Sequence, residues 1–302
     1  MEKEILIAGG SGLIGTALQE HAIELGYRVT LLSRKAGDNR IKWDPEAGTI
    51  DLPVKMRFDA IINLAGASLS EGRWTAKNKQ GIYQSRIKSC RTLENYLFDG
   101  RLSTDVYVGA SAVGIYGDMG DADVDEQTKV AKNDWFSKTV IDWEIGHRRI
   151  ETLEIRTIIV RIGIVLSTKG GALKEILQKV SLGIIPYFGN GKQFWPWIHI
   201  DDLVRMIFYC IDHAEIHGTY LAAAPYPATN KKLIKTINSY LKPKKLIVSV
   251  PRFILKLMLG EMHRVVFDSC KSNSKKIIAA GFQFKFPTID EAAKEIISHI
   301  NS

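Results

Sequence analysis

Short apolar blocks and segments of helical spacing alternate along the first two thirds of the chain. Five mostly apolar runs have the composition of buried parallel strands; they span residues 5–8, 27–32, 58–64, 105–110 and 155–160. Segments with apolar positions at helical spacing follow several of them, the first over residues 13–25. Because strands and helices alternate, the sequence predicts an α/β fold, a doubly wound parallel sheet of the Rossmann type.

The pattern also predicts how the chain is divided. We expect an NAD(P)-binding Rossmann domain over residues 1–227, with 166–195 contributing to the substrate lobe. A smaller, mostly helical C-terminal substrate domain is expected over 228–302.

Several helices have predictable starts. One long helix is expected over residues 74–97, and another runs to Ile150 with Asn133 or Asp134 as its cap. Asp201 has the side chain of an N-cap for a helix over residues 202–211.

Three glycines follow the first strand at intervals of three residues. Gly9 permits the turn, Gly12 lets the backbone approach a pyrophosphate, and Gly15 lets the helix pack on the strand. The helix N-terminus, with Leu13 and Ile14, offers free N–H groups to phosphates. Strand, glycine turn and helix together predict a dinucleotide site; the alternative is a glycine-rich turn that binds nothing.

Two further strand ends have the residues of a ligand site. The second strand ends in Ser33, Arg34 and Lys35, where an NAD site would have an acidic residue. A hydroxyl and two cations suit the 2′-phosphate of NADP instead, although an unrelated surface arginine is the alternative. Small residues, Ala65 and Gly66, follow the third strand and leave room for a ligand at the carboxyl edge of the sheet.

Composition narrows the class of protein. The 302 residues are 45% hydrophobic and 25% charged, as in a soluble globular protein, and no apolar run has the length of a membrane span, so no membrane partner is expected. We expect the N-terminal residues, which include two glutamates, to form a strand rather than a signal peptide. The three cysteines are far apart, which predicts reduced thiols in a cytoplasmic protein and no metal site.

The net charge of +8 is unevenly distributed. Residues 228–302 contain 14 Lys and Arg but 5 Asp and Glu, whereas the rest of the chain contains 27 and 28. We expect a solvated surface there, one suited to an anionic ligand. No nucleic-acid motif accompanies the charge, so no nucleic acid is expected as a partner. The chain is compatible with a monomer or a homodimer.

Five motifs together resemble the extended short-chain dehydrogenase/reductase superfamily, of the nucleotide-sugar epimerase type. They are Gly9-x-x-Gly12-x-x-Gly15, Asn63-Leu64-Ala65-Gly66, the segment from Ser111 to Gly117, Arg161-x-Gly163, and Trp197-Ile198-His199-Ile200-Asp201-Asp202.

Further landmarks resemble an atypical branch of that superfamily, the "epimerase family proteins" of family 39U, which have a C-terminal domain of unknown function. These landmarks are Trp43-Asp44, Arg73-Trp74, Trp143-Glu144, Leu259-Gly260-Glu261 and Ala280-Gly281-Phe282. The resemblance implies that six residues lie near NADP: Ser33, Arg34, Leu64, Ala65, Arg86 and Val165.

The chain departs from the superfamily at its catalytic pair. Active members have Tyr-x-x-x-Lys, in which the lysine lowers the tyrosine pKa so that the phenol can exchange a proton. When the helices are aligned on Glu144, Phe136 replaces the tyrosine and Val140 the lysine. Lys138 is two residues away, on a different helix face.

Two residues are candidates for the missing proton chemistry. Ser111 occupies the serine position of the superfamily; the alternative is a strand-end hydroxyl that satisfies a backbone group. Tyr116, in the following loop, is the second candidate, and the alternative is that its ring only packs. His199 could act as a base, but a structural role is the main hypothesis for it. The sequence therefore predicts an NADP-binding oxidoreductase or epimerase acting on an unknown small molecule. The alternative is a non-enzymatic NADP-binding sensor or scaffold.

Overall fold

The computed structural model describes residues 3–131 and 134–301 and divides into two compact units. The first unit combines residues up to 111 with 138–160 and 204–219; the second combines 112–137, 161–203 and the residues from 220 onward. The two units are therefore interleaved along the chain. The predicted division at residue 227 concerns consecutive domains and stays a prediction.

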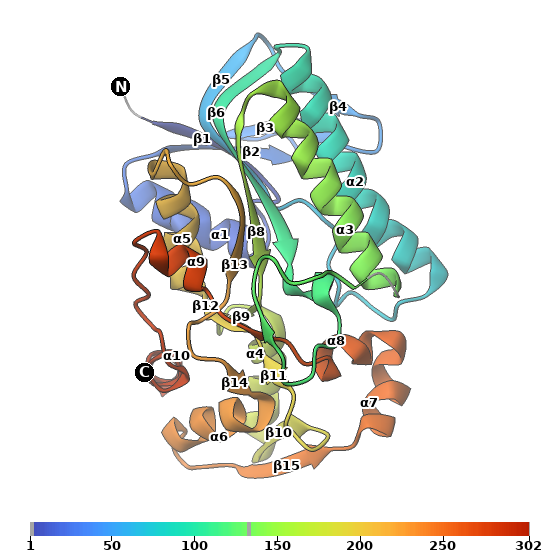
Figure 1. Ribbon diagram of the computed structural model, residues 1–302, viewed down its shortest axis with the longest axis vertical. Helices are drawn as coiled ribbons and strands as arrows, with labels where there is room; N and C mark the ends of the chain where they lie inside the picture. Colours follow the sequence, from blue (N-terminus) through green and yellow to red (C-terminus); the bar gives the residue numbers. More distant parts are fainter. Residues whose placement is uncertain (1–2, 132–133, 302) are drawn as a thin grey trace. The chain divides into compact units, whose positions relative to one another are not determined.

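An eight-stranded sheet confirms the predicted α/β fold (Figure 1). Its order is β13-β8-β6-β5-β1-β2-β3-β4, and β2–β3, β1–β2, β1–β5 and β5–β6 pair in parallel, whereas β3–β4 is antiparallel. The strands are β1 Glu4–Ala8, β2 Arg28–Ser33, β3 Arg40–Asp44, β4 Thr49–Ile50, β5 Met56–Asn63, β6 Leu102–Ala112, β8 Arg156–Ile162 and β13 Gly218–Ala222.

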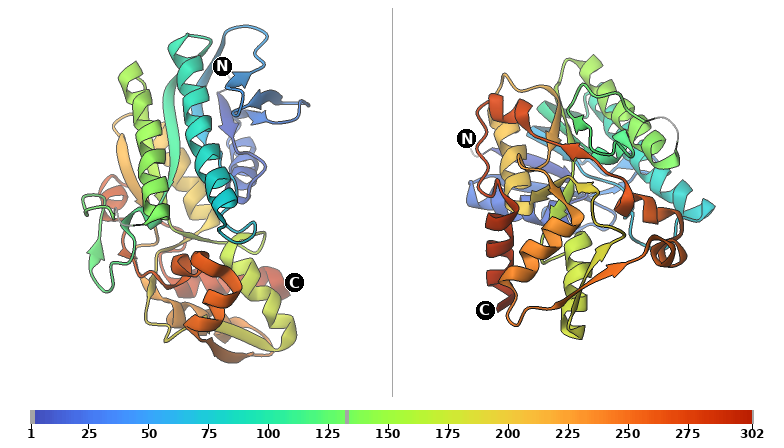
Figure 2. Two further views of the ribbon diagram at one scale, coloured as in Figure 1. Left: turned by 90° about the vertical axis from the view of Figure 1, so that its right-hand side faces the viewer. Right: turned by 60° about the horizontal axis from the view of Figure 1, so that its bottom comes forward.

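Helices cover both faces of the sheet in the first unit, which is why its central strands are continuously apolar. On one face α2, Ala76–Phe98, lies beside α3, Trp135–Arg148 (Figures 1 and 2). On the other face α1, Leu13–Glu24, contacts α5, Ile200–Asp212, through the rings of His21 and Phe208, whose centroids are 5.5 Å apart.

The strand order reverses next to β1, since β2 and β3 lie on one side of it and β5 and β6 on the other. Ala8 pairs with Asn63, and Asn63 pairs with Gly109, so β1 and β5 end at the same level, whereas β6 continues for three more residues to Ala112. A crevice at such a switch point is the usual ligand site of an open α/β sheet.

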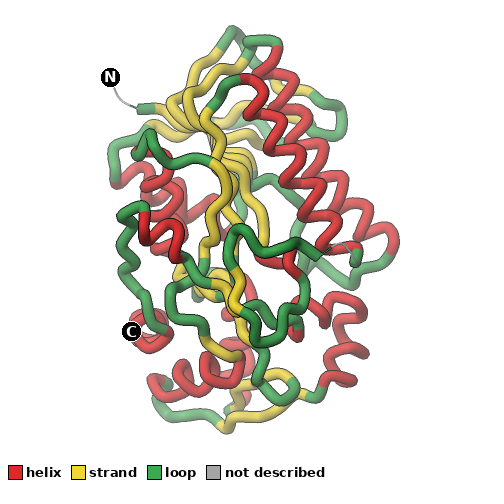
Figure 3. The backbone as a smooth tube through the Cα atoms, viewed as in Figure 1, coloured by secondary structure: helices red, strands yellow, loops and turns green. Residues whose placement is uncertain are grey.

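The second unit is built from short strand pairs and helices around its own core (Figure 3). The pairs are β7 Asp123–Val124 with β16 Lys271–Ser272, β9 Ile164–Leu166 with β12 Trp197–His199, β10 Ile184–Phe188 with β15 Leu246–Val250, and β11 Phe194–Trp195 with β14 Ala228–Thr229. The helices are α4 Gly171–Leu177, α6 Asn230–Tyr240, α7 Arg252–Leu259, α8 His263–Phe267, α9 Lys275–Ala279 and α10 Ile289–Asn301. In the described part of the chain, no helix is both long and apolar enough to cross a membrane.

Local hydrogen bonds decide where the predicted helices begin. Thr75 caps α2 by accepting from the amide of Asn78 at 3.3 Å, so this helix begins two residues later than expected. Asp134 accepts from the amides of Phe136 and Ser137 at 2.9 and 3.0 Å, as one of the two predicted caps of α3; Asn133 lies outside the described residues.

The predicted cap of α5 is wrong. The helix already begins at Ile200, so Asp201 lies in its first turn. The Nδ1 atom of His199, the preceding residue, accepts a hydrogen bond from the amide of Asp201 at 3.2 Å. The histidine ring thus supplies the acceptor for an amide of the first helical turn, which has no acceptor within the helix.

Candidate functional site

Two of the three glycines in the turn are required by the chain itself. Gly9 has φ +83°, and a Cβ there would lie 2.8 Å from the carbonyl carbon of Leu64 on the neighbouring strand end. A Cβ on Gly15 would lie 2.4 Å from the carbonyl oxygen of Gly9. These contacts fix the turn against β5 and the helix against the turn.

Gly12 is different, because the folded chain does not require a glycine there. Its φ of −80° suits any residue, it is exposed, and the nearest atom to an added Cβ is the Gly9 carbonyl oxygen at an ordinary 3.5 Å. Gly12 is also the N-cap of α1, where no side chain caps the helix and no acidic residue occupies the first turn. The first amides of the helix, beginning with Leu13 and Ile14, have no carbonyl acceptor within the helix and so form a candidate cradle for an anion.

Cations lie at the end of the neighbouring strand β2. Ser33 is half-buried, whereas Arg34 and Lys35 are exposed, and the Ser33 hydroxyl accepts from the Lys35 amide at 3.3 Å. Ser33 also pairs with Lys42 of β3, a third cation that sequence reasoning missed because the pairing becomes evident only in the sheet.

Arg86 of helix α2 reaches the residues that follow β5. Its Nη1 donates to the carbonyls of Ala67 and Ile82 at 3.1 and 2.9 Å, and a Cβ on Gly66 would lie 3.0 Å from its Cζ. Burial lowers the pKa of Arg86 to about 10, so it remains a cation at neutral pH. Among the described residues, no carboxylate forms a salt bridge with it.

Ser111 bonds a carboxylate rather than the backbone group that the alternative hypothesis required. It stands near the end of β6, and its hydroxyl donates to Oε1 of Glu144 on α3 at 2.6 Å. Both residues are buried, with 2% and 4% of their surfaces exposed. Both residues belong to the first compact unit.

A chain of buried hydrogen bonds lies directly beside this pair. Asn63 donates to the Tyr107 hydroxyl at 3.0 Å, the hydroxyl lies 2.9 Å from Nδ1 of His147, and Nε2 of His147 lies 3.0 Å from the Ala110 carbonyl oxygen. Burial lowers the pKa of His147 to about 4, so the ring is neutral and donates to Ala110 through Nε2. Gly109 makes room for this ring, since a Cβ there would lie 2.5 Å from it.

The three cysteines, Cys90, Cys210 and Cys270, are buried and none of them forms a disulfide. Burial raises the pKa of the Cys90 and Cys270 thiols to about 12, which makes them poor nucleophiles. In the described chain, no group of three or more His, Cys, Asp or Glu residues is placed to hold a metal ion.

The two positions of the superfamily pair are filled by apolar packing. Val140 is buried, and the Phe136 ring packs on Gly114, where a Cβ would lie 2.2 Å from it. Lys138 is exposed, in agreement with its different helix face. Sequence reasoning used Glu144 only as a landmark and missed its pairing with Ser111. The pairing could have been suspected because Glu144 is a charged residue on the helix face that buries Val140, Trp143 and His147.

Two other predicted site residues belong to the second unit. The buried Tyr116 hydroxyl donates to the Asp125 carbonyl at 2.8 Å and accepts from Arg161 at 2.6 Å. Burial raises the pKa of Tyr116 to about 12, so its phenol is a weak acid with its hydrogen bonds already made. Val165 is half-buried in β9 and pairs with Ile198 of β12.

The Trp-Ile-His-Ile-Asp-Asp motif is structural in the second unit. Nε2 of the buried His199 lies 2.8 Å from Oε2 of Glu295 on α10. The fully buried Asp202 carboxylate accepts from the amides of Lys285 and Phe286 at 2.7 and 2.8 Å. Both side chains therefore hold the last part of the chain, which agrees with a structural role for His199.

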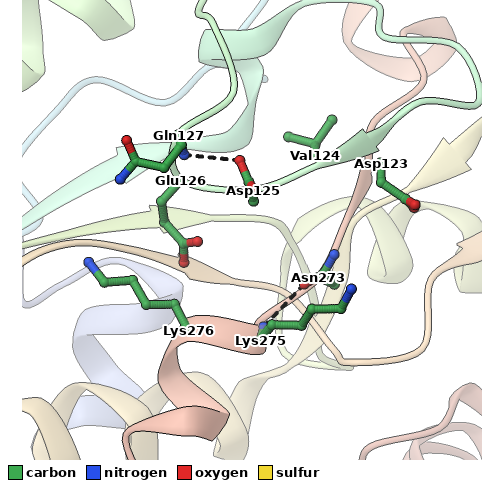
Figure 4. Close-up of a pocket in the computed structure, with 8 residues that line it drawn as sticks. All are labelled: Asp123, Val124, Asp125, Glu126, Gln127, Asn273, Lys275 and Lys276. Atoms are coloured by element: carbon green, nitrogen blue, oxygen red, sulfur yellow. Dashed lines mark hydrogen bonds between the residues drawn. The ribbon is translucent and has the colours of Figure 1, made fainter.

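The second unit also contains a polar pocket of about 370 Å³. Figure 4 shows its lining residues, Asp123, Val124, Asp125, Glu126, Gln127, Asn273, Lys275 and Lys276. None of them is a predicted site residue. Carboxylates and ammonium groups share the walls, and Asp123 also pairs with Lys271 at 2.9 Å, so the pocket has no single charge to select a ligand.

Comparisons with known proteins agree with these features. A model of the NAD dependent epimerase/dehydratase family matches residues 5–223, and a model of a domain of unknown function, DUF1731, matches residues 250–296. The human epimerase family protein SDR39U1 is 31% identical over 97% of this chain and 99% of its own length. The epimerase family protein YfhF of Bacillus subtilis is 32% identical over 97% of this chain and 98% of its length.

A solved structure extends this similarity to the whole fold. The crystal structure of human SDR39U1 (isoform 2) with NADPH has a TM-score of 0.90 at 30% identity and covers 98% of this chain and 99% of that one.

Proposed function

Because the chain belongs to the NAD dependent epimerase/dehydratase family, we propose that it is an NADP(H)-binding oxidoreductase or epimerase of the extended short-chain dehydrogenase/reductase type. Its substrate would be a small molecule. The similar human protein was crystallised with NADPH, which supports the choice of cofactor. Bound NADP(H) would supply hydride transfer, and the residues of this chain would bind, orient and exchange protons.

The observation that most supports this proposal is the glycine at position 12. Gly9 and Gly15 are needed for close backbone packing, but Gly12 has an ordinary φ and free space in front of it. The glycine there is explained if a ligand uses the space that a side chain would fill. The uncapped start of α1 then offers its amides to the pyrophosphate of the cofactor.

The strand-end residues fit the rest of the cofactor. Ser33 and Arg34 offer a hydroxyl and a guanidinium without an adjacent acidic residue, which suits a 2′-phosphate. Leu64, Ala65 and Gly66 follow β5, and Gly66 lies against the Arg86 guanidinium, so this strand end would hold another part of the cofactor.

A Gly12→Val variant tests this proposal. The chain leaves room for the new side chain, so we expect the variant to fold, while NADPH affinity falls at least 100-fold because the side chain fills the pyrophosphate space. Fluorescence titration with NADPH would measure the affinity, and circular dichroism would report folding. The matched control is Gly81→Ala, a helical glycine with nothing within 4 Å of an added Cβ. Unchanged NADPH affinity in a folded Gly12→Val protein would contradict the proposed site.

One observation favours the non-enzymatic alternative, a sensor or scaffold that binds NADP. Neither Phe136 nor Val140 can transfer a proton, and the Tyr116 phenol is occupied by structural hydrogen bonds. The choice between an enzyme and a binding protein therefore depends on whether another group supplies the proton.

A further inference from the structure

A buried carboxylate lies one helical turn beyond the position of the missing lysine. On helix α3, Val140 and Glu144 are four residues apart and both buried, so they share one face. Val140 fills the position of the superfamily lysine. Glu144 interrupts the apolar surface one turn further along that face. Its Oε1 accepts a hydrogen bond from the Ser111 hydroxyl at 2.6 Å.

The sheet places this pair at the same edge as the glycine turn. Gly109 pairs with Asn63 and Asn63 with Ala8, and Ser111 follows Gly109 by two residues on β6, so it lies just beyond the edge at which β5 and β1 end. Two strand spacings separate β6 from β1, a distance of about 10 Å. All of these residues belong to the first unit.

The surroundings hold Ser111 and Glu144 in position. His147, one turn after Glu144 on the same helix, bonds the Ala110 carbonyl next to Ser111. Because this ring is neutral and its nitrogens are engaged by Ala110 and Tyr107, it anchors helix α3 to strand β6. The carboxylate and hydroxyl are thereby fixed before any substrate binds.

We propose that Ser111 and Glu144 form the proton-transfer pair of this protein, in place of tyrosine and lysine; this inference rests on the proposed function. Ser111 is the catalytic residue that touches the substrate oxygen, and Glu144 is a positioning residue that acts through it. The observed hydrogen bond runs from Ser111 to Glu144, which is the direction needed for Glu144 to accept a proton.

Alcohol oxidation would move one proton and one hydride from the substrate. The substrate hydroxyl gives its proton to Oγ of Ser111 while Ser111 passes its own proton to Oε1 of Glu144. Bound NADP⁺ would supply the acceptor for the hydrogen on the same substrate carbon, which would leave as a hydride, so that the C–O bond would become a carbonyl. Carbonyl reduction is the reverse, with Glu144 returning the proton through Ser111.

The first test needs no substrate and uses Glu144→Gln, which keeps the volume and the acceptor oxygen for Ser111 but removes the charge. The nicotinamide of NADP⁺ is positively charged and that of NADPH is not. A carboxylate at the reacting end therefore favours NADP⁺, and we expect the variant to lose about three- to tenfold of its NADP⁺ affinity relative to its NADPH affinity. Titration with both nucleotides measures this ratio.

The matched control is Asp142→Asn, which removes a charge from the same helix at a half-buried site bonded to Tyr83. Its affinity ratio should equal that of the wild type. An unchanged ratio in Glu144→Gln would overturn the inference while leaving NADPH binding intact. Failure of the wild type to bind either nucleotide would instead overturn the proposed function.

The second test measures NADPH consumption with a panel of small ketones, aldehydes and quinones. For any compound that the wild type reduces, Glu144→Gln should lower kcat about 10²- to 10⁴-fold with little change in KM. Ser111→Ala should lower kcat similarly yet keep the wild-type nucleotide ratio, and it replaces Glu144→Gln if that variant fails to fold. Undiminished kcat in a folded Glu144→Gln or Ser111→Ala protein would refute the pair.

Discussion

Arg34 is the residue on which the choice between NADPH and NADH depends most directly. It is exposed at the end of β2, and no acidic residue stands at positions 33–35 to repel a 2′-phosphate. We expect tighter binding of NADPH than of NADH, and Arg34→Ala should remove most of the difference. A charge-assisted hydrogen bond contributes roughly 1.5–3 kcal/mol, or about 10- to 150-fold in affinity.

Parallel titrations of the two nucleotides would measure this preference. Arg28→Ala is the matched control, because Arg28 is an exposed arginine at the opposite end of the same strand. Equal affinities for NADPH and NADH in the wild type would contradict the 2′-phosphate site. A residual preference in Arg34→Ala would point to Lys35 or Lys42 instead.

The site was most predictable from the sequence at positions where the backbone geometry allows only glycine. The positive φ of Gly9 and the close approach at Gly15 follow from the strand–turn–helix pattern alone. The partner of Ser111 could not be predicted in this way. Glu144 lies 33 residues later in the chain and becomes a neighbour of Ser111 only when α3 packs on β6. The same holds for Lys42, which reaches Ser33 through strand pairing.

Among the helices, α5 has a structurally important acidic residue at its start, and this residue is Asp202 rather than Asp201, the cap that the sequence predicted. The buried Asp202 carboxylate accepts from two backbone amides of residues 285 and 286, which joins the start of the helix to the C-terminal segment. Asp202→Asn weakens these bonds and turns an amide group toward a backbone donor. We expect it to lower the free energy of unfolding by about 2–4 kcal/mol, since hydrogen bonds to charged groups contribute roughly 1.5–3 kcal/mol each.

Urea denaturation would measure this change, and hydrogen exchange at residues 285 and 286 would locate it. Asp201→Asn is the control: its neighbouring carboxylate is 44% exposed and lies 3.6 Å from Lys285 Nζ, a surface pair of the kind that contributes about 0–1 kcal/mol. Similar losses in the two variants would show that Asp202 does not hold the segment.

Element boundaries were less predictable than element types for the same reason. The apolar runs predicted the central strands, because buried parallel strands need continuous apolar residues. The helix starts depend on single hydrogen bonds, at Thr75 for α2 and at His199 for α5. A histidine in place of the usual Ser, Thr, Asp or Asn is not a recognisable cap in a sequence.

At the scale of the whole molecule, the sequence predicted the sheet but not the two interleaved units. Each unit collects segments from three parts of the chain, and the boundaries fall near strand ends such as Ser111 and Val160. No turn or linker marks these positions, because the strands continue through the sheet. The basic residues of the C-terminal quarter belong to the second unit, whereas the proposed nucleotide cradle belongs to the first.

The acid stability of the molecule should depend on His147, which is fully buried in the first unit. Its pKa is lowered from 6.5 to about 4 by burial, so the folded protein binds this proton less readily than the unfolded chain. The stability that the neutral ring contributes is therefore fully present above pH 6.5. It is lost as the pH falls toward 4, and the loss is about 2 kcal/mol by pH 5.

Urea denaturation at pH 7.5 and pH 5 would test this dependence, with His147→Gln as the comparison because glutamine can still bond Ala110 but does not titrate. The variant should be less stable at pH 7.5 and should lose about 2 kcal/mol less than the wild type on acidification.

Asp268, whose pKa is raised to about 6 by burial, has the opposite effect on the pH dependence of stability, because its neutral form is favoured in the folded state. It is present in both proteins, so the difference between them isolates His147. Equal losses on acidification would mean that the ring accepts a proton without leaving its place between Tyr107 and Ala110, and that the anchor of α3 beside Ser111 and Glu144 does not depend on a neutral imidazole.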